Sequence, residues 1–158
     1  MRIEFGKVMA ELINKDPRTY LLFGDSGYGI FDQIKRENPS HLINLGVTEQ
    51  ATIGLASGMA LEGLKPYIYS ITPFVLERPY EQIKLDIVEQ NAEVKIIGFW
   101  NYPHAGPTHT TKNPEKLCDL LGLRYFAPKD SKETRDKIIE RHNISGPAFF
   151  YLTKDFLK

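Results

Sequence analysis

The sequence predicts an α/β fold of three layers, in which a mostly parallel sheet of about six strands is covered by helices on both faces. Short apolar runs of strand length alternate with segments of helical periodicity along the chain. The runs are apolar throughout, which is typical of parallel strands buried on both faces. With 158 residues the chain has the length of one ordinary domain, and residues 1–158 are expected to form it.

The first elements follow from local signals. Apolar residues from Phe5 to Ile13 recur at helical spacing, and Asp16-Pro17 ends that helix. "TYLLFG" is a buried strand, closed by the loop "GDSGYG". "FDQIKRE" is a short helix stopped by Asn38-Pro39, and "HLINL" is the second strand.

The middle of the chain continues the alternation. A helix from Thr48 to Leu61 precedes the strand "YIYSI", and a further helix is expected from about Pro79 to Gln90. "VKIIGF" is the next strand, and the polar, turn-rich "WNYPHAGPTHTTKN" is a long loop.

The last third adds two helices and two strands. Pro114 to Leu121 is predicted to be helical because proline suits a first turn, and "LRYFA" is a strand. Ser131 can cap a helix that reaches His142, and "AFFYL" after Gly146-Pro147 is the final strand.

Composition excludes several functional classes. Twenty basic and twenty acidic residues cancel, with no basic cluster to follow a phosphate backbone, so nucleic-acid binding is not expected. No apolar run approaches the ~20 residues of a membrane span, and the N-terminus does not resemble a secretory signal. A cytoplasmic location is expected. The single cysteine, Cys118, predicts a reduced, buried thiol and no cysteine-cluster metal site.

Three loops with unusual chemistry follow predicted strands: "GDSGYG", "GVTEQ" and "NYPHAGPTH". Ligands of parallel sheets bind at the carboxyl ends of strands, where the strand order reverses. These loops therefore predict a site at that edge, although Gly and Pro also gather in ordinary turns.

The segment that begins at Thr48 combines an acid with a helix of small residues. With Thr48 as N-cap, Glu49 lies in the first turn, where the helix dipole favours a negative charge; a solvated acid that stabilises its own helix is the alternative. Gly54 and Gly58 each cost about 0.8–1.0 kcal/mol relative to alanine in a helix interior. They predict a tight contact with another helix, inside the domain or across a subunit interface.

The motifs resemble a known family. "INLGVTEQATIGLASGMALEGLKPYIYSITPFVLERPYEQI" is similar to the pyrimidine-binding domain of transketolase-like enzymes, which use thiamine diphosphate. The similarity continues through "KIIG" and "GPTH" to "GPAFFYLTKD" and covers most of the chain. The group includes transketolases, deoxyxylulose-phosphate synthases and the β chains of 2-oxo-acid dehydrogenases.

The resemblance assigns roles to four residues. Glu49 matches a glutamate that hydrogen-bonds the ring nitrogen of the cofactor's aminopyrimidine and favours its imino form. Phe74 and Tyr80 match aromatic walls of the pyrimidine pocket, with core packing as the alternative. His109 in "GPTH" matches a histidine that faces the substrate and can move protons there.

Four further candidates are weaker. Asp25 in "GDSG" resembles an acid near the cofactor, but turns favour Asp in any protein. Arg78 and Lys154 lie where relatives carry cations for a substrate phosphate, and an exposed charge is the alternative for each. His104 shares the loop of His109; two histidines without a carboxylate are a weak metal signal, so no metal site is predicted in this chain.

Departures from the family pattern indicate a divided enzyme. No paired asparagines follow "GDSGYG", so the resemblance implies that a separate subunit supplies the diphosphate and Mg²⁺ site, in a hetero-oligomer with two copies of each chain. Ala105 replaces an acid that recognises a hydroxyl of sugar substrates, and Lys154 replaces an arginine. Both changes imply an altered carbonyl or sugar substrate.

The resemblance therefore predicts the pyrimidine-binding subunit of a split transketolase, which transfers a two-carbon ketol or related acyl unit. Two alternatives remain open. One is the small subunit of a split 2-oxo-acid decarboxylase, although "GPTH" and "PYEQI" favour the transketolase side. The other is a non-catalytic subunit that stabilises or regulates a partner, against which the presence of Glu49 argues.

Overall fold

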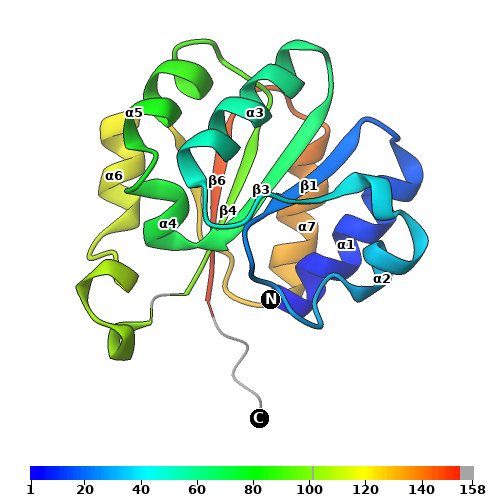
Figure 1. Ribbon diagram of the computed structural model, residues 1–158, viewed down its shortest axis with the longest axis horizontal. Coiled ribbons are helices and arrows are strands. Elements are labelled where there is room, and N and C mark those ends of the chain that lie inside the picture. Colours follow the sequence, from blue (N-terminus) through cyan, green and yellow to red (C-terminus); the bar gives the residue numbers. More distant parts are fainter. Residues whose placement is uncertain (101, 154–158) are drawn as a thin grey trace.

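The computed structural model describes residues 1–100 and 102–153, and in these its centre is one sheet of six parallel strands (Figure 1). The order across the sheet is β2-β1-β3-β4-β6-β5. The strands are β1 (Thr19–Phe23), β2 (Leu42–Asn44), β3 (Lys65–Ile71), β4 (Lys95–Phe99), β5 (Arg124–Phe126) and β6 (Ala148–Leu152). The predicted fold class and the predicted parallel sheet are confirmed.

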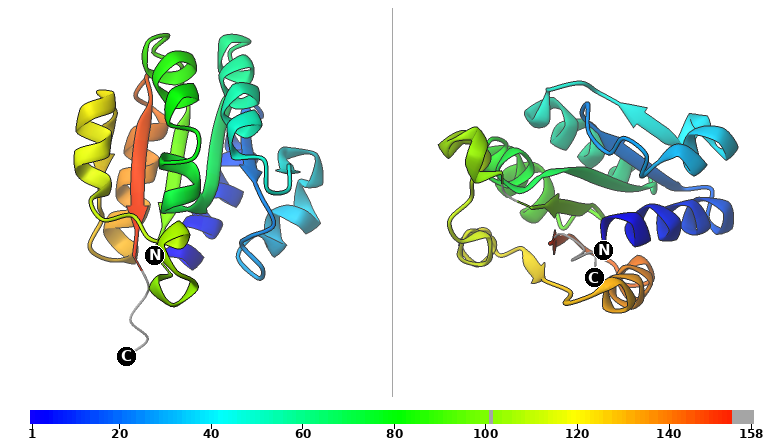
Figure 2. Two further views of the ribbon diagram at one scale, coloured as in Figure 1. Left: turned by 60° about the vertical axis from the view of Figure 1, so that its left-hand side comes forward. Right: turned by 90° about the horizontal axis from the view of Figure 1, so that it is seen from below.

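Helices cover both faces of the sheet (Figures 1 and 2). One apolar core lies under α1 (Arg2–Lys15), α2 (Asp32–Glu37) and α7 (Ser131–His142). The other lies under α3 (Glu49–Leu61), α4 (Thr72–Leu76), α5 (Tyr80–Gln82), a π-helix (Ile83–Val88) and α6 (Pro114–Leu121). Short 3₁₀ turns complete the chain at Pro39–His41, Pro103–Ala105 and Pro107–His109. Cys118 is buried and free, as predicted.

The expected helix from Pro79 to Gln90 is wrong in its geometry. The structure has the short α5 followed by the π-helix, in which backbone bonds such as Glu89 N–H to Lys84 O (3.0 Å) span five residues. The hydroxyl of Ser57 in α3 donates to the carbonyl of Asp86 at 2.7 Å, so the widened turn is bound to the neighbouring helix. The helix α4, with Pro73 in its first turn, was not predicted.

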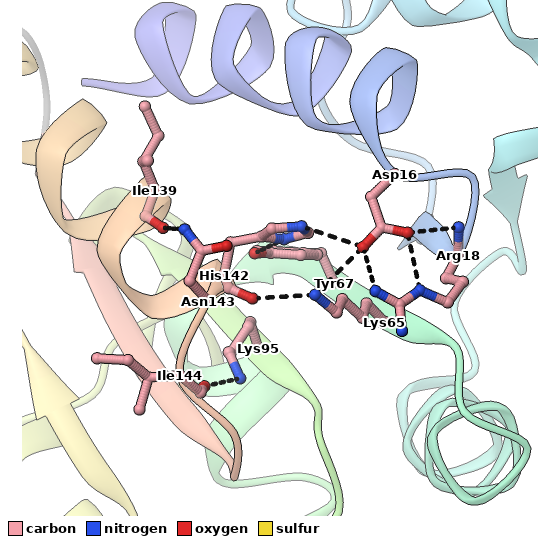
Figure 3. A network of polar contacts seen from close by, with 9 residues as sticks. All are labelled: Asp16, Arg18, Lys65, Tyr67, Lys95, Ile139, His142, Asn143 and Ile144. Atoms are coloured by element: carbon pink, nitrogen blue, oxygen red, sulfur yellow. Dashed lines mark hydrogen bonds and ion pairs between the residues drawn. The ribbon is translucent and has the colours of Figure 1, made fainter.

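The two ends of the sheet differ in their polar chemistry. At the amino end, the Asp16 carboxylate accepts from Arg18 at 2.9 and 2.8 Å and pairs with Lys65 Nζ at 3.2 Å (Figure 3). Lys95, at the start of β4, is buried, and its Nζ donates to the carbonyls of Gly146 (2.7 Å) and Ile144 (3.3 Å). These contacts tie the amino end of the sheet to the segment that follows α7.

The strand order reverses between β1 and β3. The connection that leaves β1 runs through α2 on one face, whereas the connection that leaves β3 runs through α4 on the other. The carboxyl ends of these two neighbouring strands therefore border a crevice, which is where parallel sheets bind ligands.

Candidate functional site

Two glycines let the loops after β1 and β2 approach closely at this crevice. A Cβ on Gly24 would lie 2.2 Å from the carbonyl oxygen of Gly46, so only glycine fits at position 24. The Asn44 amide joins the same loops: its Oδ1 accepts from the backbone N–H of Asp25 (3.2 Å) and of Gly46 (3.0 Å). The resulting crevice is floored by backbone rather than by side chains.

Glu49 lines this crevice as the first residue of α3, together with Gly24, Gly46 and Ser70. Its side chain is only 15% exposed. Thr48 occupies the N-cap position as predicted, but its hydroxyl donates to the Leu45 carbonyl at 2.7 Å and does not cap the helix. The helix start therefore leaves Glu49 directed at the crevice with its first-turn N–H groups nearby.

Arg78 connects Glu49 to Phe74. Its Nη1 lies 3.0 Å from Glu49 Oε1, and its guanidinium carbon lies 3.3 Å from the centroid of the Phe74 ring. The Arg78 side chain is 37% exposed and paired, so the alternative of an unpaired exposed charge is wrong. The prediction that Arg78 binds a substrate phosphate is untested.

His109 contacts the opposite side of this group. Its ring meets Phe74 edge-on, with centroids 4.9 Å apart, and its Nδ1 lies 2.9 Å from the Thr108 hydroxyl. Sequence positions 49, 74, 78 and 109 are thus brought into one connected set of contacts. His104 lies exposed in the turn Pro103–Ala105, apart from that set.

A hollow beside His109 contains a cation that sequence reasoning missed. Arg2, His109, Phe99 and Tyr102 line it, with the loop after β1 on the other side. Arg2 Nε donates to the Tyr69 hydroxyl at 2.7 Å, and its guanidinium carbon lies 4.0 Å from the Phe99 ring centroid. Burial raises the pKa of Tyr69 to about 12, so this hydroxyl stays protonated at neutral pH.

The remaining candidates lie elsewhere. Asp25 has a left-handed backbone (φ 44°), and its carboxylate accepts from the Asn44 amide at 3.0 Å, so it braces the loop. Tyr80 packs against the apolar core under α3 and does not line the crevice, which is the core-packing alternative. Lys154 lies outside the described residues. Ala105 is exposed in the loop of His104.

Gly54 and Gly58 lie on an open face of α3. A Cβ at either position would meet nothing within 4 Å, so a tight contact inside the domain is wrong. Leu55 (42% exposed), Leu61 (63%) and, on the adjacent π-helix, Leu85 (47%) border the glycines. The part of the expectation that remains is a contact across a subunit interface.

The described residues offer neither a metal cluster nor a membrane-spanning helix. In residues 1–100 and 102–153, no group of three or more His, Cys, Asp or Glu side chains could hold a metal ion. Over the same residues, no helix has the length and apolar character that crossing a membrane requires.

Comparison with known proteins agrees with this geometry. The family model "Transketolase, pyrimidine binding domain" matches residues 1–158. A 33.6 kDa protein of the fasciation locus of Rhodococcoides fascians is 33% identical over 152 residues, covering 94% of this chain and 48% of that protein. One of the two apulose-4-phosphate transketolase chains of Actinobacillus succinogenes, named as a subunit of that enzyme, is 31% identical over 121 residues, covering 74% and 39% respectively.

Solved structures agree as well. A split-gene transketolase, described as an inactive beta4 tetramer, superimposes with a TM-score of 0.87 at 26% identity, covering 96% of this chain and 50% of that one. Campylobacter jejuni transketolase, at 17% identity and a TM-score of 0.82, shares the fold. The chain spans about half, or less, of the length of these relatives. It belongs to the transketolase pyrimidine-binding domain family, whose enzymes depend on thiamine diphosphate.

Proposed function

We propose that residues 1–158 are a single pyrimidine-binding domain that works as one half of a split thiamine diphosphate-dependent transferase. A separate subunit supplies the diphosphate and Mg²⁺ site in a cytoplasmic hetero-oligomer with two copies of each chain. The names of two relatives, a transketolase subunit and a split-gene transketolase, support a divided enzyme.

The observation that carries the proposal is the position of Glu49. A carboxylate that is 15% exposed opens α3 at a crevice whose floor would be filled by a Cβ on Gly24. This cradle fits the edge of a flat heterocycle, and the Phe74 ring supplies a face for stacking. Bound thiamine diphosphate supplies a stabilised carbanion equivalent for attack on carbonyl groups. Glu49 holds the proton shared with the pyrimidine ring nitrogen.

The hollow beside His109 is the proposed substrate side. His109 is held edge-on against Phe74, where its imidazole can move a proton at the reacting carbonyl oxygen. Arg2, anchored on Tyr69 and Phe99, places a positive charge in the same hollow. This pairing favours a carbonyl substrate with an anionic group, in agreement with transfer of a two-carbon ketol unit between sugar phosphates or related compounds.

The partner subunit is proposed to pack on the open face of α3. Glycines 54 and 58 leave room there for another backbone, and exposed leucines provide apolar area around them. The face begins one turn beyond Glu49, so a subunit bound on it would close the crevice and remove water from the carboxylate.

Replacement of Glu49 by glutamine tests the proposal. The chain is co-expressed with a diphosphate-binding transketolase subunit, and two-carbon transfer from ketose phosphates and decarboxylation of 2-oxo acids are both measured. We expect Glu49→Gln to assemble normally and to lose turnover by about 100-fold or more, the usual size of an acid–base contribution. Glu77→Gln, an exposed carboxylate at the end of α4, is the control. Unchanged turnover in an assembled Glu49→Gln complex would exclude the catalytic role.

A further inference from the structure

The guanidinium of Arg78 fills the space between the carboxylate of Glu49 and the ring of Phe74. One side of it pairs with Glu49 Oε1 at 3.0 Å, and its flat face lies over Phe74, 3.3 Å from the ring centroid. A pyrimidine ring that hydrogen-bonds Glu49 and stacks on this face of Phe74 would need the same volume. This overlap rests on the function proposed above.

A guanidinium and an aminopyrimidine present similar chemistry to this pair of residues. Both are flat, both carry N–H donors in the plane, and both stack on an aromatic face. Glu49 and Phe74 therefore keep a hydrogen-bond partner and a stacking partner when no cofactor is present. Without Arg78, a largely buried carboxylate would face the crevice without a countercharge, which is costly.

The backbone at Arg78 is fixed independently of its side chain. The carbonyl of Arg78 accepts a long hydrogen bond from the Gln50 amide at 3.5 Å, and its N–H bonds to the Pro73 carbonyl at 3.2 Å. The side chain, which is 37% exposed, can therefore leave the ring by rotation about its own bonds while the backbone stays in place.

We propose that Arg78 is a placeholder for the aminopyrimidine: it occupies the ring's position in the free chain and swings out when the cofactor enters. Each entering ring must break the ion pair and the stacking contact. The free chain consequently binds the cofactor more weakly than its crevice alone would allow. Tight binding is reserved for the assembled enzyme, in which the partner's contacts offset this cost.

The test uses the purified full chain and the aminopyrimidine half of thiamine, in its hydroxymethyl form, as the probe. Binding is followed by NMR through backbone signals of Gly46 and Glu49, and Arg78 is followed through its side-chain Nε–Hε signal. Arg78→Ala is compared with wild type. Arg36→Ala, which removes a 69% exposed arginine on α2, is the matched control.

We expect Arg78→Ala to bind the probe at least fivefold more tightly than wild type, with Arg36→Ala unchanged. In wild type, saturation with the probe should move the Arg78 Nε–Hε signal to the position of a solvated arginine. Equal or weaker binding by Arg78→Ala, with probe shifts still centred on Glu49, would overturn the placeholder and leave the proposed function standing. Absence of binding by both proteins up to the solubility of the probe would overturn both.

Discussion

Replacing Lys95 by methionine should remove a pH dependence from the stability of this protein. Lys95 is 2% exposed, and burial lowers the pKa of its ammonium group from 10.5 to about 8. Between these two values the unfolded chain holds a proton that the folded chain has released. The free energy of unfolding therefore rises with pH across this window.

The size of the effect follows from the shift. A displacement from 10.5 to about 8 corresponds to about 3 kcal/mol of stability that is absent at pH 7 and gained by pH 10.5. Methionine keeps the length and apolar stem but no proton, so its stability lacks this gain. It also leaves the carbonyls of Gly146 and Ile144 without their donor, which costs about 1–3 kcal/mol at every pH.

Urea unfolding of both proteins at several pH values from 7 to 10.5 measures the effect. Other groups titrate equally in the two proteins, so the difference between their curves isolates Lys95. Lys132→Met, at an exposed position of α7, should run parallel to wild type. Parallel curves for Lys95→Met and wild type would refute the reasoning, because they would mean that the ammonium group is solvated.

Three further substitutions test other parts of the structure. Gly98→Ala would place a Cβ 2.5 Å from Phe149 Cζ and should cost about 1–3 kcal/mol in urea unfolding; a neutral effect would contradict the packing under α4. Arg18 is the main cause that lowers the pKa of Asp16, so Asp16→Asn should lose roughly 2–3 kcal/mol above pH 4, and its deficit should shrink as acid titrates the wild-type carboxyl; a deficit that persists in acid would count against the ion pair. Gly54→Leu should stabilise the free chain by about 0.5–1 kcal/mol and weaken partner binding tenfold or more in titrations; undiminished binding would exclude α3 as the interface.

The fold was predictable because its strands are apolar on both faces. β3, β4 and β6 are buried almost throughout, and each had a continuous apolar run in the sequence. α4 was missed because five residues with Pro73 at the start are too short to show a period. The π-helix was missed because one additional residue in a turn leaves the apolar pattern nearly unchanged.

The candidate site was predictable only where a motif carried it. Glu49, Phe74 and His109 were found through their motifs, and the structure joins them. The partners of Arg78 were not predictable, because an arginine after α4 has no local signal for a carboxylate 29 residues earlier. Arg2 was missed for the same reason, since its contact with Tyr69 spans 67 residues.

The amide of Asn44 has a consequence for how such an enzyme would come together. One side chain holds the turns after two neighbouring strands in register, and its partners are all supplied by the chain itself. The cofactor's berth is thus built before a second polypeptide arrives. We therefore expect encounter to proceed by docking of finished surfaces, at the pace of ordinary protein association, without a slow rearrangement in this half.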